Sequence, residues 1–192
     1  LNIDQLQVEL ASDAGIVRAI DGLALSIQRG ETFALVGESG CGKSMTALAL
    51  MRLLPEAGQV VGGDIQLDGT DLLSLPESAM RGMRGGRIGM VFQEPGTSLN
   101  PVLTVGRQLR EAIETHTPLR GEAARTKAID WLRRVGIPEP ERRLEDYPFR
   151  LSGGQKQRVM IAMALAAEPD FLVADEPTTA LDVTIQKQIL DL

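Results

Sequence analysis

The glycine-rich segment at residues 37–44 constrains the fold of this chain more than any other feature. Residues 32–36 before it are mainly apolar and predict a buried strand, and residues 45–54 after it are rich in Ala, Leu and Met and predict a helix. The segment matches the pattern G-x-x-x-x-G-K-[ST], in which glycines let backbone N–H groups surround phosphates. A strand, this loop and a helix in succession predict an α/β fold. The segment consists of Gly37, Glu38, Ser39, Gly40, Cys41, Gly42, Lys43 and Ser44.

The last two residues of this phosphate-binding loop (P-loop) predict its ligand. The Lys43 ammonium is expected to reach the outer phosphates of a nucleoside triphosphate, and the Ser44 hydroxyl is expected to bind Mg²⁺. An ordinary glycine-rich turn between a strand and a helix is the alternative interpretation.

A second acidic element follows later in the chain. Residues 171–174 are four apolar residues that predict a strand buried on both faces, and Asp175 and Glu176 stand at its carboxyl end. Such a pair suits a P-loop, because Asp175 can support Mg²⁺ and Glu176 can act as the general base that prepares water for attack on a γ-phosphate. Without the apolar strand and the P-loop, an Asp-Glu pair would indicate only a solvated surface.

A second phosphate cradle is predicted at Leu151, Ser152, Gly153, Gly154 and Gln155, which we call the signature segment. A serine and two glycines at the start of a helix leave backbone N–H groups free to face an anion. The segment has no lysine like that of the P-loop, so we expect it to close over a nucleotide that is held elsewhere. A plain N-cap role for Ser152 is the alternative, and it is compatible with the functional one.

Together these motifs resemble the nucleotide-binding domain of ABC transporters. The P-loop, residues 91–95, the signature segment, the acidic strand and residues 178–182 occur in the family's order over nearly the whole chain. The sequence context at residues 93–101, 147–148 and 174–184 is similar to that of dipeptide, oligopeptide and nickel importer ATPases, including the type with two fused ATPase domains.

The resemblance implies an ATPase that uses ATP and Mg²⁺. Gln93 would be the Q-loop glutamine beside Mg²⁺ and the attacking water, and Glu176 would be the catalytic base. The signature segment would contact ATP on the P-loop of a second ATPase domain, paired head to tail, and Asp182 in the D-loop would cross that interface. A glutamine that merely ends a strand and a surface-loop aspartate are the alternatives. The implied ATP contacts are Val17, Gly37, Glu38, Ser39, Gly40, Cys41, Gly42, Lys43, Ser44, Met45, Ser152, Gly153, Gly154, Gln155 and Asp182, and the implied Mg²⁺ ligands are Ser44, Gln93 and Asp175.

Apolar periodicity predicts the elements around these motifs. Alternation at residues 1–10 and 17–27 indicates two strands, which we expect to form an antiparallel pair that leads into the P-loop strand. Residues 60–67 are expected to form another strand, and residues 87–92 a buried strand before Gln93. A turn is expected at Asp68 and Gly69. Helical periodicity is found at residues 105–115 and 122–135.

We therefore expect an α/β fold: a P-loop NTPase core of the ABC type with an antiparallel β subdomain and an inserted α-helical subdomain. Residues 1–93 are assigned to the ATP-binding core with the β subdomain, residues 94–168 to the helical subdomain with the signature segment, and residues 169–192 to the acidic strand and D-loop, which return to the core.

Charge and hydropathy bear on the partners. The net charge of −6 argues against a general nucleic-acid binder, because phosphate backbones require clustered lysine and arginine. No apolar run approaches the roughly 20 residues that cross a bilayer. We expect a peripheral protein at the cytoplasmic face of the inner membrane, bound to transmembrane permease subunits and indirectly to an extracytoplasmic solute-binding protein, that drives uptake of peptides or a related small solute. The alternatives are a soluble ABC ATPase that acts on ribosomes or DNA and a non-hydrolysing nucleotide-sensing module.

Two positions depart from the family pattern. Family members carry an aromatic residue before the P-loop that stacks on adenine, whereas Val17 is the nearest match here, so an apolar contact is expected. The family's switch histidine lies beyond the D-loop, whereas the one histidine of this sequence is His116, which we expect to be solvated at a helix end. We therefore expect a truncated ATPase that alone binds Mg-ATP and hydrolyses it weakly or not at all.

Overall fold

The computed structural model describes residues 1–13, 15–178, 181 and 183–191. They divide into two compact units, Leu1–Met80 and Arg81–Leu192. The predicted Asp182 lies outside the described residues.

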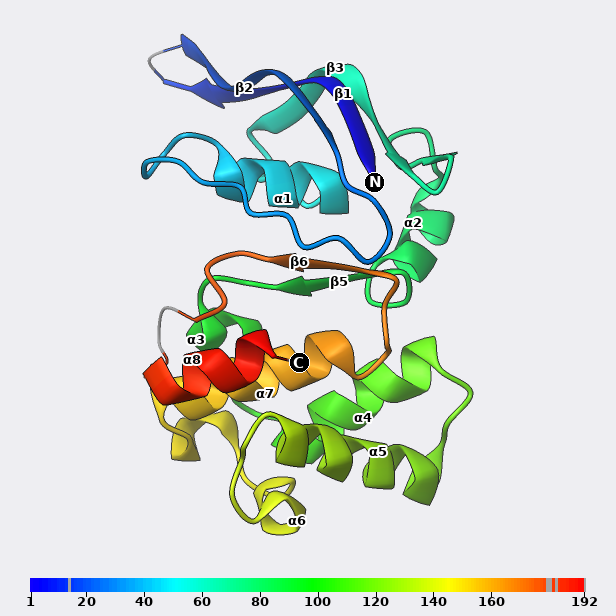
Figure 1. The fold of residues 1–192 in the computed structure, drawn as a ribbon, viewed down its shortest axis with the longest axis vertical. Coiled ribbons are helices and arrows are strands. Elements are labelled where there is room, and N and C mark those ends of the chain that lie inside the picture. Colours follow the sequence, from blue (N-terminus) through cyan, green and yellow to red (C-terminus); the bar gives the residue numbers. More distant parts are fainter. Residues whose placement is uncertain (14, 179–180, 182, 192) are drawn as a thin grey trace. The chain divides into compact units, whose positions relative to one another are not determined.

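The first unit is built on a four-stranded antiparallel sheet with the strand order β2-β1-β3-β4 (Figure 1). The antiparallel pair predicted near the amino terminus is confirmed, and so is the third strand. Asp68 and Gly69 have φ of 48° and 77° and make the expected turn between the last two strands, since two-residue hairpin turns favour positive φ. The strands are β1 (Asn2–Ser12), β2 (Gly15–Ser26), β3 (Gly58–Leu67) and β4 (Thr70–Asp71).

A β-bulge adjusts the core face of β1. Ile3, Leu6 and Val8 are all buried, although the first two are three residues apart rather than two. The register shifts between Ile3 and Leu6, and Gln5 has a φ of 47°, so the extra residue returns Leu6 to the buried face. Opposite the bulge, Gly63 has a φ of 82°, and a Cβ there would lie 2.4 Å from the Gln5 carbonyl oxygen. Only glycine fits at this position.

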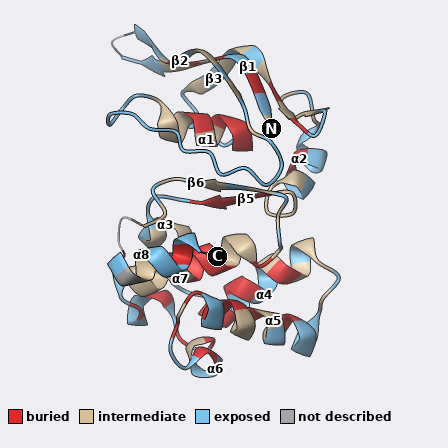
Figure 2. Ribbon diagram, viewed as in Figure 1, coloured by how far each residue is buried: buried red, intermediate tan, exposed pale blue. Residues whose placement is uncertain are grey.

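The first unit also contains α1 (Lys43–Met51), while α2 (Glu77–Met83) crosses the boundary between the units. The helix predicted after the P-loop is thus confirmed. It buries Ala49, Leu50 and Met51 (Figure 2). Arg52 caps its carboxyl end with a left-handed φ of 51°.

The strand predicted at residues 32–36 is wrong. Residues 31–38 form neither helix nor strand, and Phe33, Leu35 and Val36 are 45%, 41% and 89% exposed. Apolar character favours a strand only where a neighbouring strand supplies a ladder, and this segment pairs with no strand of the sheet in its own unit.

The second unit combines a small parallel sheet with helices. Strand β5 (Ile88–Val91) pairs with β6 (Phe171–Ala174) in parallel, with Ile88 opposite Phe171 and Val91 opposite Ala174. Both strands were predicted. The expectation that residues 171–174 are buried on both faces is wrong, because Leu172 is 40% exposed and Ala174 is exposed. In the described part of the chain β6 has a partner strand on one edge only.

Helices α4, α5 and α7 enclose the core of the second unit, where Leu109, Ile113, Leu132, Val159 and Ile161 are buried (Figure 2). Both predicted helical segments are confirmed in α4 and α5. The helices are α3 (Pro95–Ser98), α4 (Val105–His116), α5 (Gly121–Arg134), α6 (Pro140–Arg143), the 3-10 turn η1 (Pro148–Arg150), α7 (Gly153–Leu165) and α8 (Val183–Leu190).

His116 is the last residue of α4, as expected, but it is not fully solvated. A Cβ on Gly85 would lie 2.5 Å from His116 Nε2, so the ring packs on the backbone of that glycine. Burial lowers the pKa of His116 from its ordinary value of 6.5, because a charged imidazole loses hydration there.

Candidate functional site

The P-loop lies in the first unit and ends where α1 begins. Gly40 and Gly42 have φ of 84° and 95°, which side chains rarely adopt. A Cβ on Gly42 would also lie 2.6 Å from the Ala19 carbonyl oxygen of β2, so the loop approaches this strand too closely for any other residue. These two glycines therefore set the path of the loop into the helix.

The start of α1 is suited to an anion. Gly42 precedes it without any side-chain hydrogen bond to the helix, and its first turn holds no acidic residue. The backbone N–H groups of that turn carry the positive end of the helix dipole. The residues that surround this helix end thus fit the phosphates of a nucleotide.

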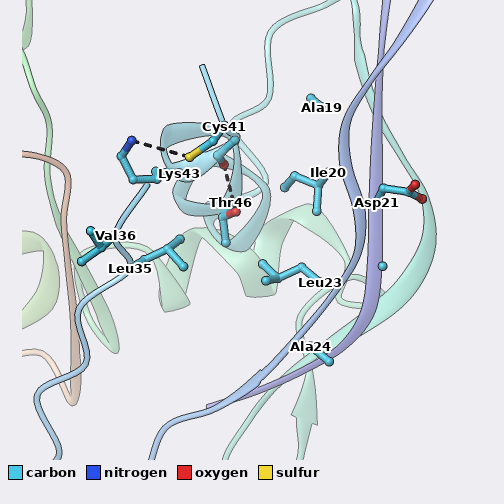
Figure 3. A pocket seen from close by; sticks show the side chains of 12 residues that line it. Ala19, Ile20, Asp21, Leu23, Ala24, Leu35, Val36, Cys41, Lys43 and Thr46 are labelled. Atoms are coloured by element: carbon cyan, nitrogen blue, oxygen red, sulfur yellow. Dashed lines mark hydrogen bonds between the residues drawn. The ribbon is translucent and has the colours of Figure 1, made fainter. Parts of the chain in front are cut away.

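Lys43 adds a positive charge at the same place. Its Nζ donates to the carbonyl oxygens of Gly37 and Glu38, both at 2.8 Å, and lies 3.7 Å from Cys41 Sγ (Figure 3). These backbone carbonyls are neutral acceptors, so the ammonium keeps its charge available to a phosphate. Ser44 and Met45 follow in α1 and are half-buried.

A pocket of about 420 Å³ lies beside the P-loop in the first unit (Figure 3). Lys43 and Thr46 line one part of it, and Ile20, Leu23 and Leu35 line another. Val17 is not among its lining residues and is 54% exposed on β2. Its contact with adenine stays a prediction.

The second unit brings Gln93, Asp175 and Glu176 together. Gln93 follows β5, and the two carboxylates follow β6, so all three stand at the carboxyl ends of parallel strands, where ligands bind in open α/β sheets. The Asp175 N–H donates to the Val91 carbonyl oxygen at 2.9 Å and extends the ladder by one residue. Gln93 Nε2 donates to Glu176 Oε2 at 3.1 Å.

Glu176 has an unusual backbone. Its φ is 49°, in the left-handed region, and Pro177 follows it. A residue before proline favours extended conformations, and left-handed conformations are uncommon for residues with a side chain. Such outliers cluster at functional sites, where surrounding contacts hold them.

The signature segment lies in the second unit at the start of α7. Leu151 is buried, whereas Ser152 and Gly153 are exposed and the next two residues are half-buried. Ser152 is the N-cap: its Oγ accepts from the Gln155 N–H at 3.2 Å, and the Ser152 N–H donates to Gln155 Oε1 at 2.9 Å. The N-cap alternative is thus confirmed, and a contact with phosphate stays a prediction.

Space remains open at the mouth of this helix. A Cβ on Gly153 would meet no atom within 4 Å. The first turn of α7 also contains no acidic residue. An anion could therefore approach the N–H groups of Gly153 and Gly154, which is the chemistry that the sequence predicts.

Binding of Mg²⁺ by Ser44, Gln93 and Asp175 stays a prediction. Ser44 lies in the first unit, and Gln93 and Asp175 lie in the second. Within the described residues, no group of three or more His, Cys, Asp or Glu side chains could hold a metal ion. Mg²⁺ in nucleotide sites takes few protein ligands and several phosphate or water oxygens, so a hydroxyl and one carboxylate are a suitable donor set.

Two glutamines near Glu176 were not among the predicted site residues. Gln157 donates to the backbone carbonyl of Pro177, and Gln186 donates to those of Thr178 and Leu181, all of which follow Glu176. Gln157 is 20 residues from its partner, and single side-chain contacts of this kind leave no periodic pattern in the sequence, so no local signal indicated them.

Among the described residues, no helix has the length and apolar character needed to span a membrane.

Comparisons with known proteins agree with the motifs. The model of a family described as ABC transporter matches residues 20–179. The probable peptide ABC transporter ATP-binding protein y4tR of Sinorhizobium fredii and the dipeptide transport ATP-binding protein DppD of Bacillus subtilis are both 51% identical over 193 residues. Each match covers 100% of this chain and 58% of the relative, so the chain spans less than two thirds of their length.

A solved structure has the same fold. The ATP-binding cassette MJ0796, in a dimeric post-hydrolysis state bound to ADP and Pi, matches with a TM-score of 0.89 at 29% sequence identity. The match covers 99% of this chain and 79% of that chain. The predicted fold class, an α/β P-loop core of this type, is therefore confirmed.

Proposed function

The chain belongs to the ABC transporter family, and we propose that it provides the ATP-binding and ATP-hydrolysing residues of an importer for peptides or a related small solute. The observation that carries the proposal is the pair Gln93 and Glu176, which are hydrogen-bonded at the ends of β5 and β6. A P-loop in the same chain supplies the residues for phosphate binding.

The roles follow from the chemistry of each side chain. Lys43 and the first turn of α1 bind phosphates, and Ser44, Gln93 and Asp175 would hold Mg²⁺. When bound, Mg²⁺ neutralises charge on the phosphates. Glu176 orients a water molecule and accepts its proton, and the Gln93 amide, which is uncharged, can both donate and accept beside it. Val17 contacts adenine through apolar atoms.

The names of the relatives support the substrate class. Two relatives are named as peptide or dipeptide transport ATP-binding proteins, and each is 51% identical to this chain. We extend that class to this protein, with a transmembrane permease as its partner, an extracytoplasmic solute-binding protein acting indirectly, and a place at the cytoplasmic face of the inner membrane. The functional division into residues 1–93, 94–168 and 169–192 belongs to the same proposal.

A direct test uses the full-length protein and its Glu176→Gln and Lys43→Ala variants. Glu176→Gln should bind ATP normally and lose turnover by a factor of about 10²–10⁴, because it keeps the shape of the base without its proton affinity. Lys43→Ala should lose binding. Glu145→Gln, which changes an exposed carboxylate outside the site, is the matched control and should leave both unchanged. Normal turnover by Glu176→Gln would refute the proposed base, and ATP binding without turnover in the unmodified protein would favour a nucleotide sensor.

The proposed partner is a second ATPase domain in a head-to-tail dimer, supported by the dimeric state of the matched cassette. In such a dimer the signature segment of one domain completes the P-loop site of the other. A Lys43→Ala chain mixed with a Ser152→Arg chain, both at full length, should recover one intact site and measurable turnover. If the mixture is as inactive as each parent, the head-to-tail arrangement is wrong.

A further inference from the structure

The segment that follows Glu176 is held by side chains from two helices. Gln157 of α7 donates from Nε2 to the Pro177 carbonyl oxygen at 2.9 Å. Gln186 of α8 donates from its Nε2 to the carbonyl oxygens of Thr178 and Leu181, at 3.1 and 3.0 Å. Both amides thus fix a backbone that begins one residue after the proposed catalytic base.

Gln157 is the more informative of the two glutamines. It is only 1% exposed, and its Oε1 is buried without a hydrogen-bond partner. Because the Pro177 carbonyl can only accept, the amide nitrogen must face it, and the orphaned oxygen follows from that orientation. A buried acceptor without a partner is destabilising, so the orphaned Oε1 offsets much of the stability that one hydrogen bond to the half-buried Pro177 carbonyl provides. Stability alone therefore does not account for a glutamine here.

The bond does explain how Glu176 keeps its conformation. Glu176 combines a φ of 49° with a following proline, an arrangement that local preferences oppose. Strained residues persist only where neighbouring contacts fix them. On one side the Glu176 carboxylate accepts from Gln93, and on the other the Pro177 carbonyl accepts from Gln157.

The same bond joins the base to the signature segment. Gln157 lies two residues after Gln155 in the helix that Ser152 caps, and its partner Pro177 is bonded covalently to Glu176. We propose that Gln157 is a positioning residue, which ties the backbone of Glu176 to the signature helix α7 so that a shift of either is transmitted to the other. This inference rests on the proposed function, in which Glu176 is the base.

The first experiment separates positioning from folding in the full-length protein. Gln157→Met keeps the side-chain length, removes the donor and removes the orphaned oxygen. We expect kcat for ATP to fall at least tenfold, KM to stay within twofold and the melting temperature to change little, because the lost bond to Pro177 and the removed orphaned oxygen have opposite effects on stability. Gln188→Met is the matched control, since Gln188 is an exposed glutamine of α8 whose Nε2 donates to the Arg134 carbonyl oxygen, away from Glu176. It should leave kcat unchanged. Unchanged kcat in Gln157→Met, or a loss matched by a lower melting temperature, would overturn the proposal.

Two further readouts keep the test decisive. Gln157→Glu can donate to the Pro177 carbonyl only when its carboxyl is protonated, so its activity relative to the unmodified protein should rise as the pH falls. A constant ratio of the two activities across pH would contradict the inference. This test remains valid if Gln157→Met does not fold. Hydrogen exchange needs no turnover: Gln157→Met should speed exchange of the described amides after Pro177, and Gln188→Met should not. Equal exchange refutes the tether itself, whereas faster exchange in a protein that does not hydrolyse ATP refutes only the proposed function.

Discussion

Gln93 Nε2 and Glu176 Oε2 are 3.1 Å apart, and the hydrogen bond between them joins two residues that are 83 positions apart in the sequence. Each stands beyond the carboxyl end of its strand, with Val91 of β5 opposite Ala174 of β6. The parallel register of the two strands is therefore what brings the amide to the carboxylate.

Loss of this amide should impair turnover rather than folding. In Gln93→Leu the donor to Glu176 is gone, and we expect kcat to fall at least about tenfold because the base is no longer oriented. Gln93 is exposed, so the melting temperature should change little. Steady-state kinetics and thermal unfolding of the full-length protein measure both.

A matched control lies in the first unit, where Gln66 Nε2 donates to Asp64 Oδ2 at 2.9 Å. Gln66→Leu removes a bond of the same kind away from the base and should keep kcat. Equal losses of kcat in the two variants would show that the Gln93 bond has no special role.

The N-cap of α7 allows capping to be separated from phosphate binding. Ser152→Ala removes the acceptor for the Gln155 N–H and should cost about 0.5–2 kcal/mol of stability. Ser152→Asp keeps a capping oxygen but adds a negative charge at the mouth of the proposed cradle. We expect it to unfold at nearly the same temperature as the unmodified protein and to lose ATPase activity, since the charge repels the γ-phosphate. Full activity in Ser152→Asp would leave Ser152 with a capping role alone.

Local sequence patterns predicted the elements whose conformation depends on residues that are adjacent in the sequence. The serine and two glycines at residues 152–154 predict the helix start that Ser152 caps, and Asp68 with Gly69 predicts the hairpin turn. The segment at residues 32–36 shows the limit of apolar runs, because a strand depends on partners elsewhere in the chain. The left-handed backbone of Glu176 opposes its local preference, so only contacts from distant residues could have indicated it.

Asp146 should make the second unit sensitive to acid. It is 7% exposed, and hydrogen bonds and charge from Arg143, with a smaller contribution from Arg150, lower its pKa from the ordinary 3.8. Because the folded pKa is below the unfolded one, this stabilisation is complete above about pH 4 and is lost as the pH falls through the lowered pKa. Asp146→Asn should cost about 1–3 kcal/mol at neutral pH, since Arg143 then loses its charged partner.

Glu168 provides the comparison for Asp146. Lys127 lowers the pKa of Glu168 by a hydrogen bond, but the Glu168 side chain is 70% exposed, so solvent screens the pair. Glu168→Gln should cost no more than about 1 kcal/mol. Urea unfolding at neutral pH and at pH 3 compares the two variants. Equal losses of unfolding free energy at neutral pH would show that burial does not strengthen the interaction of Asp146 with Arg143.

His116 should weaken the fold as the pH falls through the range near neutrality. Burial against Gly85 lowers its pKa below 6.5, so the unfolded chain takes up a proton before the folded chain does. The free energy of unfolding therefore decreases as the pH falls below about 6.5, by at most about 1.4 kcal/mol per pH unit, until the lowered pKa is reached. His116→Gln removes this titration, and the stability of the unmodified protein relative to that variant should fall between pH 7.5 and 5.5. Gly85→Ala is the steric control. Gly85 has a φ of 77°, and an added Cβ would meet the His116 ring, so this variant should destabilise the fold by a similar amount at both pH values. A constant difference between the unmodified protein and His116→Gln across this range would show that burial does not hold the imidazole neutral.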